Sequence, residues 1–385
     1  MADRMDKKRP HGGSFGGHGG DVHRASRLTG IPVHEIIDFS ASINPLGASP
    51  KALNAASDAM SGRNIGNYPP PHACELARRI ERMLRAPEKG EAFSGRVIVG
   101  NGSTELIYLI PRAFRPKTVL IHGPTFSEYG RAALLSGARV RVSKSDPLNK
   151  GTGPFDLDRF LRDMRASGAD MAFICNPNNP TGQLLGREAM ARLAVEAAKA
   201  RCRLVVDEAF MDFCPGQSLV VDAIKGKGNR KKTWLIVLRS MTKFHALTGF
   251  RIGYAVFGSA SDAEKTLGCK EPWSVNTPAI EAAMAALDDT AHAQKTLRLM
   301  EREREYIGRR LTEEGIWHLP TAANFFLIKI KRPGGLIERL FRKGILVRDC
   351  SNFPGLGEGF IRIAIKKRRE NRLLLDTIRD FLSRP

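Results

Sequence analysis

The sequence predicts an α/β protein with a large sheet domain followed by a smaller α/β domain. Several short apolar runs end at glycine, asparagine or aspartate and lead into turns or helix starts, as buried strands of a covered sheet do. From about residue 260 to 315 the chain becomes mostly helical and charged, and apolar strands then alternate with helices to the C-terminus. This change of pattern indicates the second domain.

Length and composition fit this division. The chain has 385 residues, 42% of them hydrophobic, which is enough to bury a sizeable core. No run approaches the ~18 uninterrupted apolar residues of a membrane helix. Residues 1–20 are basic and glycine-rich without an apolar stretch, so we expect a flexible arm and no secretory signal. Six scattered cysteines without a CxxC pair favour reduced thiols in a cytoplasm over disulfides or a zinc site.

The formal net charge of +21 is high for a protein of this size. Basic clusters such as residues 230–232 and 366–369 come without a nucleic-acid-binding motif, and aromatic residues make up only 7%. We therefore interpret the clusters as solvated faces and expect no nucleic-acid partner. A positive field would also attract an anionic substrate.

One stretch, SMTKFHALTGFRIGY from Ser240, organises the rest of the chain. It follows an apolar run short enough to be a buried strand, and open α/β sheets place their ligands beyond such strand ends. Lys243, with Ser240 before it and Arg251 after it, suits an amine that forms an imine with an aldehyde cofactor whose phosphate the other two hold. A solvated lysine in a glycine-bearing loop is the alternative for a lone lysine; here the chain supplies matching partners elsewhere.

Further polar residues follow other predicted strands. After the run that begins at Arg96, Ser103 and Thr104 fall in the first turn of a helix, where free N–H groups favour a phosphate, although an ordinary helix cap has the same pattern. A third strand ends in the rigid turn NPNNPTG, which contains Asn179. Asp207 ends a fourth strand, and a carboxylate buried there needs a partner such as a pyridinium N–H.

The apolar run that begins at Thr118 leads into a loop, and an aromatic residue there could contact a flat heterocycle. Phe126 or Tyr129 could offer a ring face for it, although core packing is the commoner role of a phenylalanine. Nearer the N-terminus, we expect a short helix that ends at Gly30, and then a strand-like entry into a Pro/Gly turn over residues 36–47.

The C-terminal part predicts strands over residues 325–330, 345–350 and 360–365, with helices around 335–343 and 370–382. Arg348 and Arg362 each interrupt an apolar strand. They either face solvent, as arginines in alternating strands usually do, or are set to bind the anionic groups of a substrate.

Together these segments resemble the aminotransferase-like family of fold-type-I pyridoxal-phosphate (PLP) enzymes that includes the histidinol-phosphate aminotransferases. The resemblance is greatest to its decarboxylating branch, the threonine-phosphate decarboxylases of cobamide biosynthesis. It runs from about His18 to the C-terminus, and the following motifs distinguish it: HGG at His18, DFSASINPLG at Asp38, DEAFMDF at Asp207, PWSVN at Pro272 and VRDCSNFPGL at Val347.

The resemblance implies a large, mostly parallel seven-stranded sheet domain and a smaller C-terminal α/β domain. We accordingly expect an arm over residues 1–20, a segment near the active site over 21–50, a large PLP-binding domain over 51–260 and a small domain over 261–385. It also implies pyridoxal 5'-phosphate as cofactor and a homodimer with shared active sites, with no membrane or nucleic-acid partner.

Roles for individual residues follow from the resemblance. Lys243 would form the imine with the cofactor, and Asp207 would keep its ring nitrogen protonated. Asn179 would bind the ring hydroxyl oxygen, and Phe126 would stack on the ring. The cofactor phosphate would be held by Gly102, Ser103, Thr104, Ser240, Arg251 and, across the dimer interface, Tyr68. The substrate would be bound by His18, Gly19, Ser42, Asn179, Arg348 and Arg362.

The implied reaction is the decarboxylation of L-threonine O-3-phosphate to (R)-1-amino-2-propanol O-2-phosphate. A histidinol-phosphate-type aminotransferase and an L-serine O-phosphate decarboxylase are the nearest alternatives, and a catalytically silent binding protein is a more distant one. Three positions depart from the family pattern: Phe210 and His245 stand where relatives often carry Tyr, and Ser42 replaces an Asn.

Overall fold

A computed structural model describes residues 19–85, 95–148, 155–225 and 234–383. Its large domain contains a seven-stranded sheet in the order β2-β8-β7-β6-β5-β3-β4, which confirms the predicted fold class. All pairs are parallel except those of β8, which runs antiparallel to both its neighbours. The strands are β2 (Val97–Asn101), β3 (Thr118–Gly123), β4 (Arg139–Lys144), β5 (Met171–Cys175), β6 (Arg203–Asp207), β7 (Leu235–Ser240) and β8 (Ile252–Phe257).

Helices cover both faces of this sheet. Successive side chains of each strand point to opposite faces, so each strand presents apolar residues to both. In β6, for example, Leu204 and Val206 belong to one hydrophobic core and Val205 to the other. On the first face pack α2 (Pro50–Ala59), α4 (Cys74–Arg85), α7 (Leu157–Ser167), α8 (Arg187–Lys199), α9 (Val220–Lys225) and α11 (Thr277–Asp288). On the second face pack α5 (Gly102–Phe114), α6 (Glu128–Leu135) and α10 (Ala260–Leu267).

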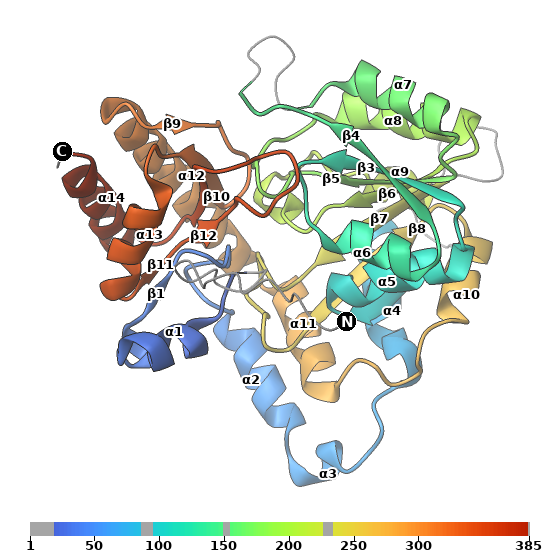
Figure 1. Cartoon of the computed structure of the whole chain (residues 1–385). Helices are drawn as coiled ribbons and strands as arrows, with labels where there is room; N and C mark the ends of the chain where they lie inside the picture. The colour runs from blue at the N-terminus through green and yellow to red at the C-terminus, as the bar shows by residue number, and fades with distance from the viewer. Residues whose placement is uncertain (1–18, 86–94, 149–154, 226–233, 384–385) are drawn as a thin grey trace, which may run out of the picture.

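The C-terminal domain is built on a separate four-stranded antiparallel sheet in the order β12-β13-β10-β9 and stands beside the large domain (Figure 1). Its strands are β9 (Trp317–His318), β10 (Phe325–Lys329), β12 (Arg348–Asp349) and β13 (Phe360–Ala364). Its helices are α12 (Thr290–Glu313), α13 (Pro333–Arg342) and α14 (Arg368–Leu382). The single strand predicted over residues 345–350 is wrong, because its first part, β11 (Ile345–Leu346), pairs with β1 (Ile37–Asp38) instead.

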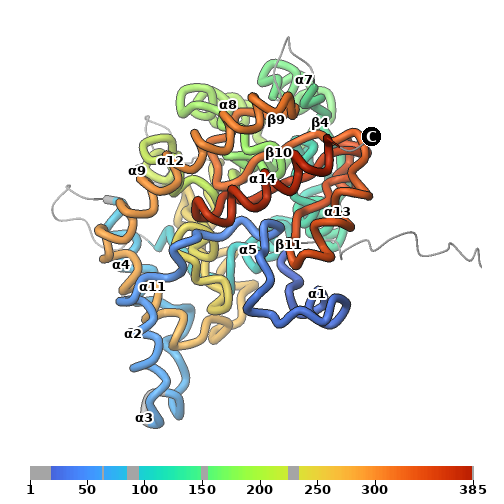
Figure 2. Tube along the Cα trace, turned by 90° about the vertical axis from the view of Figure 1, so that its left-hand side faces the viewer, coloured from blue at the N-terminus to red at the C-terminus, as the bar shows by residue number. Residues whose placement is uncertain are grey.

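The N-terminal segment joins the two domains. Its helix α1 (Val22–Thr29) begins where the Asp21 side chain accepts a hydrogen bond from the Arg24 N–H (3.0 Å) and ends at Gly30, whose φ of +75° is left-handed. The predicted helix is therefore confirmed. In both views α1 lies beside α13 (Figure 1 and Figure 2). Beyond β1, the N–H of Asn44 donates to the carbonyl of Lys243 (3.0 Å), which anchors the segment to the large domain.

The hydrophobic cores shift the expected boundary between the domains. We predicted that the small domain begins at residue 261, but α10 and α11 contribute Ala263 and Ala279 to the two cores of the large sheet. The first helix whose buried residues join the C-terminal core is α12. We therefore place the start of the C-terminal domain near Thr290. None of the helices in the described ranges is long and apolar enough to cross a membrane, and all six cysteines are free thiols.

Candidate active site

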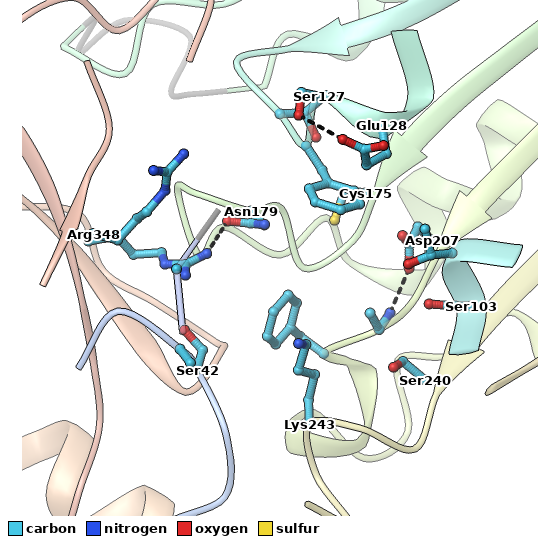
Figure 3. Close-up of a pocket in the computed structure, with 18 of the residues that line it drawn as sticks. Ser42, Ser103, Ser127, Glu128, Cys175, Asn179, Asp207, Ser240, Lys243 and Arg348 are labelled. Carbon is cyan, nitrogen blue, oxygen red and sulfur yellow. Dashed lines mark hydrogen bonds between the residues drawn. The ribbon is translucent and has the colours of Figure 1, made fainter. Parts of the chain in front are cut away.

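A cavity of about 390 Å³ lies between the two domains, at the carboxyl ends of the central strands. Figure 3 shows Ser103, Asp207 and Ser240 on one side of it, Arg348 and Ser42 on the other, and Lys243 between them. The predicted residues that line this cavity are Gly19, Ser42, Ser103, Thr104, Phe126, Asn179, Asp207, Ser240, Lys243, Arg251, Arg348 and Arg362. The fold thus brings together residues that are up to 343 positions apart.

One wall is an anion cradle at the N-terminus of α5. Gly102 begins this helix with a left-handed φ of +73°, and a Cβ there would lie 2.8 Å from Nη2 of Arg251. Ser103 and Thr104 occupy the first turn, where unpaired N–H groups favour a phosphate. The hydroxyls of Ser240 and Thr242 lie 2.7 Å apart on the same side of the cavity. This combination of N–H groups, hydroxyls and a guanidinium fits a phosphate ester.

Lys243 follows β7 and reaches into the middle of the cavity (Figure 3). Burial, together with the positive charges of Arg362 and Arg251, lowers the pKa of its amine to about 8, while Asp207 acts in the opposite direction. A larger fraction of the amine is therefore neutral near pH 7 than for an ordinary lysine. A neutral amine is the form that condenses with an aldehyde.

Asp207 ends β6 on the same side of the sheet as α6. Its carboxylate accepts hydrogen bonds from the Tyr129 hydroxyl (2.7 Å) and from the Ala209 N–H (3.0 Å). Burial raises the pKa of Asp207, and these two donors and Lys243 oppose that rise. The prediction that this carboxylate is buried and paired is confirmed, and it can still receive a further N–H donor from the cavity.

Arg348 and Arg362 lie directly opposite each other on β12 and β13. Both are buried, with 6% and 7% of their surface exposed, so the alternative that they face solvent is wrong. Arg362 donates to the Asn179 side-chain oxygen and to the Ser40 carbonyl (2.6 Å), and its Nε is buried without a partner among the described residues. Burial lowers the pKa of Arg362 to about 10. A buried guanidinium held by neutral oxygens is suited to an anionic ligand.

Four predicted residues remain, of which Ser42 and Gly19 line the cavity. Ser42 is 3% exposed, and its hydroxyl has no partner within the described part of the chain. Gly19 packs so closely on the segment after β1 that a Cβ would lie 2.3 Å from the Ser40 carbonyl oxygen. Tyr68 is 80% exposed and does not line the cavity of its own chain. His18 lies outside the described residues.

Several lining residues were not predicted as site residues. Those with polar or aromatic side chains include Thr125, Ser127, Glu128, Cys175, Thr242, Asn352 and Phe353. Each follows or ends a strand whose neighbouring residues were singled out, and this proximity is the only sequence signal for them. Of the two aromatic candidates, Tyr129 is excluded as a ring platform, because it is fully buried and its ring stacks on Phe173. Phe126 remains partly open to the cavity.

The chain matches a known protein family. The family model described as "Aminotransferase class I and II" matches residues 34–378. The chain belongs to this family. The cofactor is pyridoxal 5'-phosphate, and a fold neighbour, histidinol-phosphate aminotransferase from Sinorhizobium meliloti, was solved in complex with it (TM-score 0.78, 22% identity, covering 94% of this chain and 95% of that chain). The phosphate cradle, the lysine of lowered pKa and the buried carboxylate all fit this group.

Two kinds of aminotransferase-family enzyme are similar to the chain over nearly its whole length. Threonine-phosphate decarboxylase from Salmonella typhimurium is 32% identical over 368 residues, which cover 95% of this chain and 96% of that protein. Histidinol-phosphate aminotransferase from Symbiobacterium thermophilum is 31% identical over 359 residues, covering 91% and 92%. The structure of L-threonine-O-3-phosphate decarboxylase from Porphyromonas gingivalis aligns with a TM-score of 0.76 at 26% identity, covering 91% of this chain and all of that chain.

The lowered pKa of Lys243 predicts how the cofactor-free protein captures pyridoxal phosphate. The rate of capture should rise with pH and level off above a midpoint near 8, because only the neutral amine reacts. It can be followed by the visible absorbance that appears on condensation, with Lys243→Met as the variant that should show none. A midpoint near the ordinary lysine value of about 10.4 would contradict the prediction.

Proposed function

We propose that this chain is a PLP-dependent carboxy-lyase that converts L-threonine O-3-phosphate into (R)-1-amino-2-propanol O-2-phosphate. The observation that carries the proposal is the buried pair of arginines, Arg348 and Arg362, facing each other across two strands at the cavity. Together with Lys243 and Arg251 they give the cavity more cationic than anionic lining groups. This imbalance suits a ligand with several negative charges.

The two candidate substrates differ in the charges they present. L-threonine O-3-phosphate carries a carboxylate and a phosphate only a few bonds apart, so two guanidinium groups can bind one each. Histidinol phosphate carries a phosphate but no carboxylate, and one arginine would suffice for it. The paired arginines match the two anionic groups of the phosphorylated amino acid, and the similarity to the Salmonella threonine-phosphate decarboxylase supports the same proposal.

When bound, pyridoxal phosphate supplies an aldehyde that condenses with amines and a ring that accepts the electron pair left by departing CO2. Gly102, Ser103, Thr104, Ser240 and Arg251 hold its phosphate, as the cradle at the start of α5 suggests. Phe126 would offer a face to the ring. Asp207 and Asn179, which line the same cavity, would bind its nitrogen and its hydroxyl oxygen.

The remaining residues orient the substrate. Arg362, fixed by Asn179 and Ser40, binds the carboxylate, and Arg348, which donates to Asn352 (2.8 Å), binds the phosphate. Gly19, which follows His18 in the sequence, and Ser42 close the cavity around the phosphate. The Lys243 amine, in the middle of the cavity, returns a proton to the α-carbon once CO2 has left.

We further propose that the enzyme is a homodimer in which Tyr68 completes the phosphate cradle of the neighbouring chain. Tyr68 packs on Trp273, with ring centroids 4.8 Å apart, and both side chains are largely exposed. Exposed apolar residues on or next to α2 and α3 (Gly62–Ile65) extend the same region, which projects away from both sheets in Figure 1 and Figure 2: Leu53, Met60 and Ile65. A second copy would cover them.

Product analysis tests the proposed reaction. Incubation with L-threonine O-3-phosphate and no keto acid should release CO2 and the amine in large excess over enzyme, because protonation at the α-carbon regenerates the catalyst. A protein that turns over only when 2-oxoglutarate is added, or that accepts histidinol phosphate in preference, would be an aminotransferase instead. Labelled carboxyl carbon and a keto-acid assay on the same sample separate the two results.

Mixed dimers test the role of Tyr68. Lys243→Ala and Tyr68→Ala should each be nearly inactive alone, yet mixing their unfolded chains and refolding should restore activity. In a mixed dimer one site receives intact Lys243 and the partner's intact Tyr68, so about a quarter of wild-type activity is expected. The matched control mixes Lys243→Ala with Asp207→Ala, whose residues serve the same chain's site and should not complement. If neither mixture regains activity, the two chains do not share the site in this way.

Ser42 generates a prediction about selectivity. Its buried hydroxyl, which has no partner among the residues that the structure describes, leaves a looser fit than the asparagine usual in the family, so threonine phosphate and serine phosphate should be poorly distinguished. One methyl group is worth only about 1–3 kcal/mol in a well-fitted pocket, so small changes in fit matter. Ser42→Asn should raise the ratio of kcat/KM for threonine phosphate over serine phosphate, whereas Ser42→Ala should not. An unchanged ratio in Ser42→Asn would remove Ser42 from the selectivity of the enzyme.

A further inference from the structure

Tyr129, which lies at the wall of the cavity, connects two proposed parts of the cofactor site. It is the second residue of α6 and is fully buried. Its hydroxyl donates to Oδ2 of Asp207 (2.7 Å), which ends a strand 78 residues later in the chain. Its ring meets the edge of Phe126, with centroids 5.7 Å apart and planes at 79°.

The ring of Tyr129 is itself fixed. It stacks on Phe173 of β5, with centroids 5.2 Å apart and an interplanar angle of 14°. Both residues belong to the core between the sheet and α5 and α6. A buried, stacked ring has little rotational freedom, so its hydroxyl is held on the Asp207 carboxylate.

We propose that Tyr129 is a positioning residue whose hydroxyl keeps the proton of the cofactor ring on its nitrogen and off the Asp207 carboxylate. The proposal rests on the proposed role of Asp207 as the partner of that nitrogen. The proton between a pyridine nitrogen and a buried carboxyl group can sit on either atom. Only a protonated ring is a strong electron acceptor.

Burial alone favours the neutral carboxyl group and thus draws the proton onto Asp207. Donors to the carboxylate oppose this, because they stabilise its charged form. Those in the structure are the Tyr129 hydroxyl and the Ala209 N–H. The other titratable groups that face this pair are the Lys243 amine and the Cys175 thiol. Burial raises the pKa of Tyr129 well above its usual value, so its hydroxyl stays protonated and remains a donor at every working pH.

A purely structural role would need only the ring. Phenylalanine in this position would keep the stacking on Phe173 and the edge contact with Phe126, while losing the single hydrogen bond to Asp207. The loss of one hydrogen bond to a charged group corresponds to a factor of about ten to a hundred in an equilibrium constant. The ratio of the form with the proton on the ring nitrogen to the form with the proton on Asp207 should therefore fall by about the same factor.

The chain offers a matched control on the same side of the sheet. The Tyr108 hydroxyl, on α5, donates to the carboxylate of Glu128, which also lines the cavity. Tyr108→Phe removes a hydroxyl-to-carboxylate hydrogen bond from a neighbouring residue that has no contact with Asp207.

The experiment measures the protonation of the ring nitrogen directly. Wild type, Tyr129→Phe, Tyr108→Phe and Asp207→Asn are reconstituted with pyridoxal phosphate labelled with ¹⁵N, and the ¹⁵N chemical shift is followed against pH. Below the pH at which the ring loses its proton, we expect a protonated nitrogen in wild type and Tyr108→Phe, a ¹⁵N shift displaced toward the neutral-ring value in Tyr129→Phe and a neutral nitrogen in Asp207→Asn. If Tyr129→Phe does not retain the cofactor, 3-fluorotyrosine at position 129 is measured instead. This stronger donor should move the ¹⁵N shift toward the protonated-ring value.

The possible outcomes separate the inference from the function it rests on. If Tyr129→Phe shows the same ¹⁵N shifts as wild type while the ring is neutral in Asp207→Asn, the role of Tyr129 is overturned and that of Asp207 stands. A protonated ring in Asp207→Asn would remove both. An equal shift in Tyr108→Phe would show a general effect of losing a tyrosine hydroxyl, and would also overturn the proposal.

Discussion

The site depends on positively charged side chains that are buried away from bulk water in the cavity between the two domains. Arg362 is the centre of this arrangement: it is buried, fixed by the neutral oxygens of Asn179 and Ser40, and its Nε lacks a partner among the described residues. Elsewhere a buried arginine has carboxylate partners, as Arg239 has in Glu208 and Asp212. Burying a guanidinium without one is costly, and an anionic ligand can offset the cost.

The fold explains how such a cavity forms. Parallel strands end at one edge of the large sheet, where the turns that follow them carry the lysine, the carboxylate and the asparagine. The C-terminal sheet faces this edge with β12 and β13, and the segment after β1 fills the joint through hydrogen bonds from Asn44 to Lys243 and Phe244. No single element contains the site. The arrangement of the two sheets relative to each other creates it.

The sequence predicted those parts of the site that local pattern can encode. Asp207 ends an apolar strand and Lys243 follows one, and periodicity and turn residues identify such strand ends in the sequence. The orientation of Arg348 and Arg362 could not be decided in this way, because alternation along a strand does not say which face is covered. The contact between Tyr129 and Asp207 joins α6 to β6 and has no local signature. The domain boundary was missed because α11 packs on α2, far away in sequence.

The arginines proposed to bind the substrate and the cofactor phosphate also affect the reactivity of Lys243. Arg362 and Arg251 both lower the pKa of its amine, so in the absence of anionic ligands a larger fraction of the amine is in its neutral, nucleophilic form than for an ordinary lysine. A carboxylate on Arg362 and a phosphate on Arg251 would cancel much of that repulsion and raise the pKa again. The amine therefore gains affinity for a proton when the anionic groups occupy the cavity. Binding and proton supply are thus coupled through charge, with no movement of the fold required.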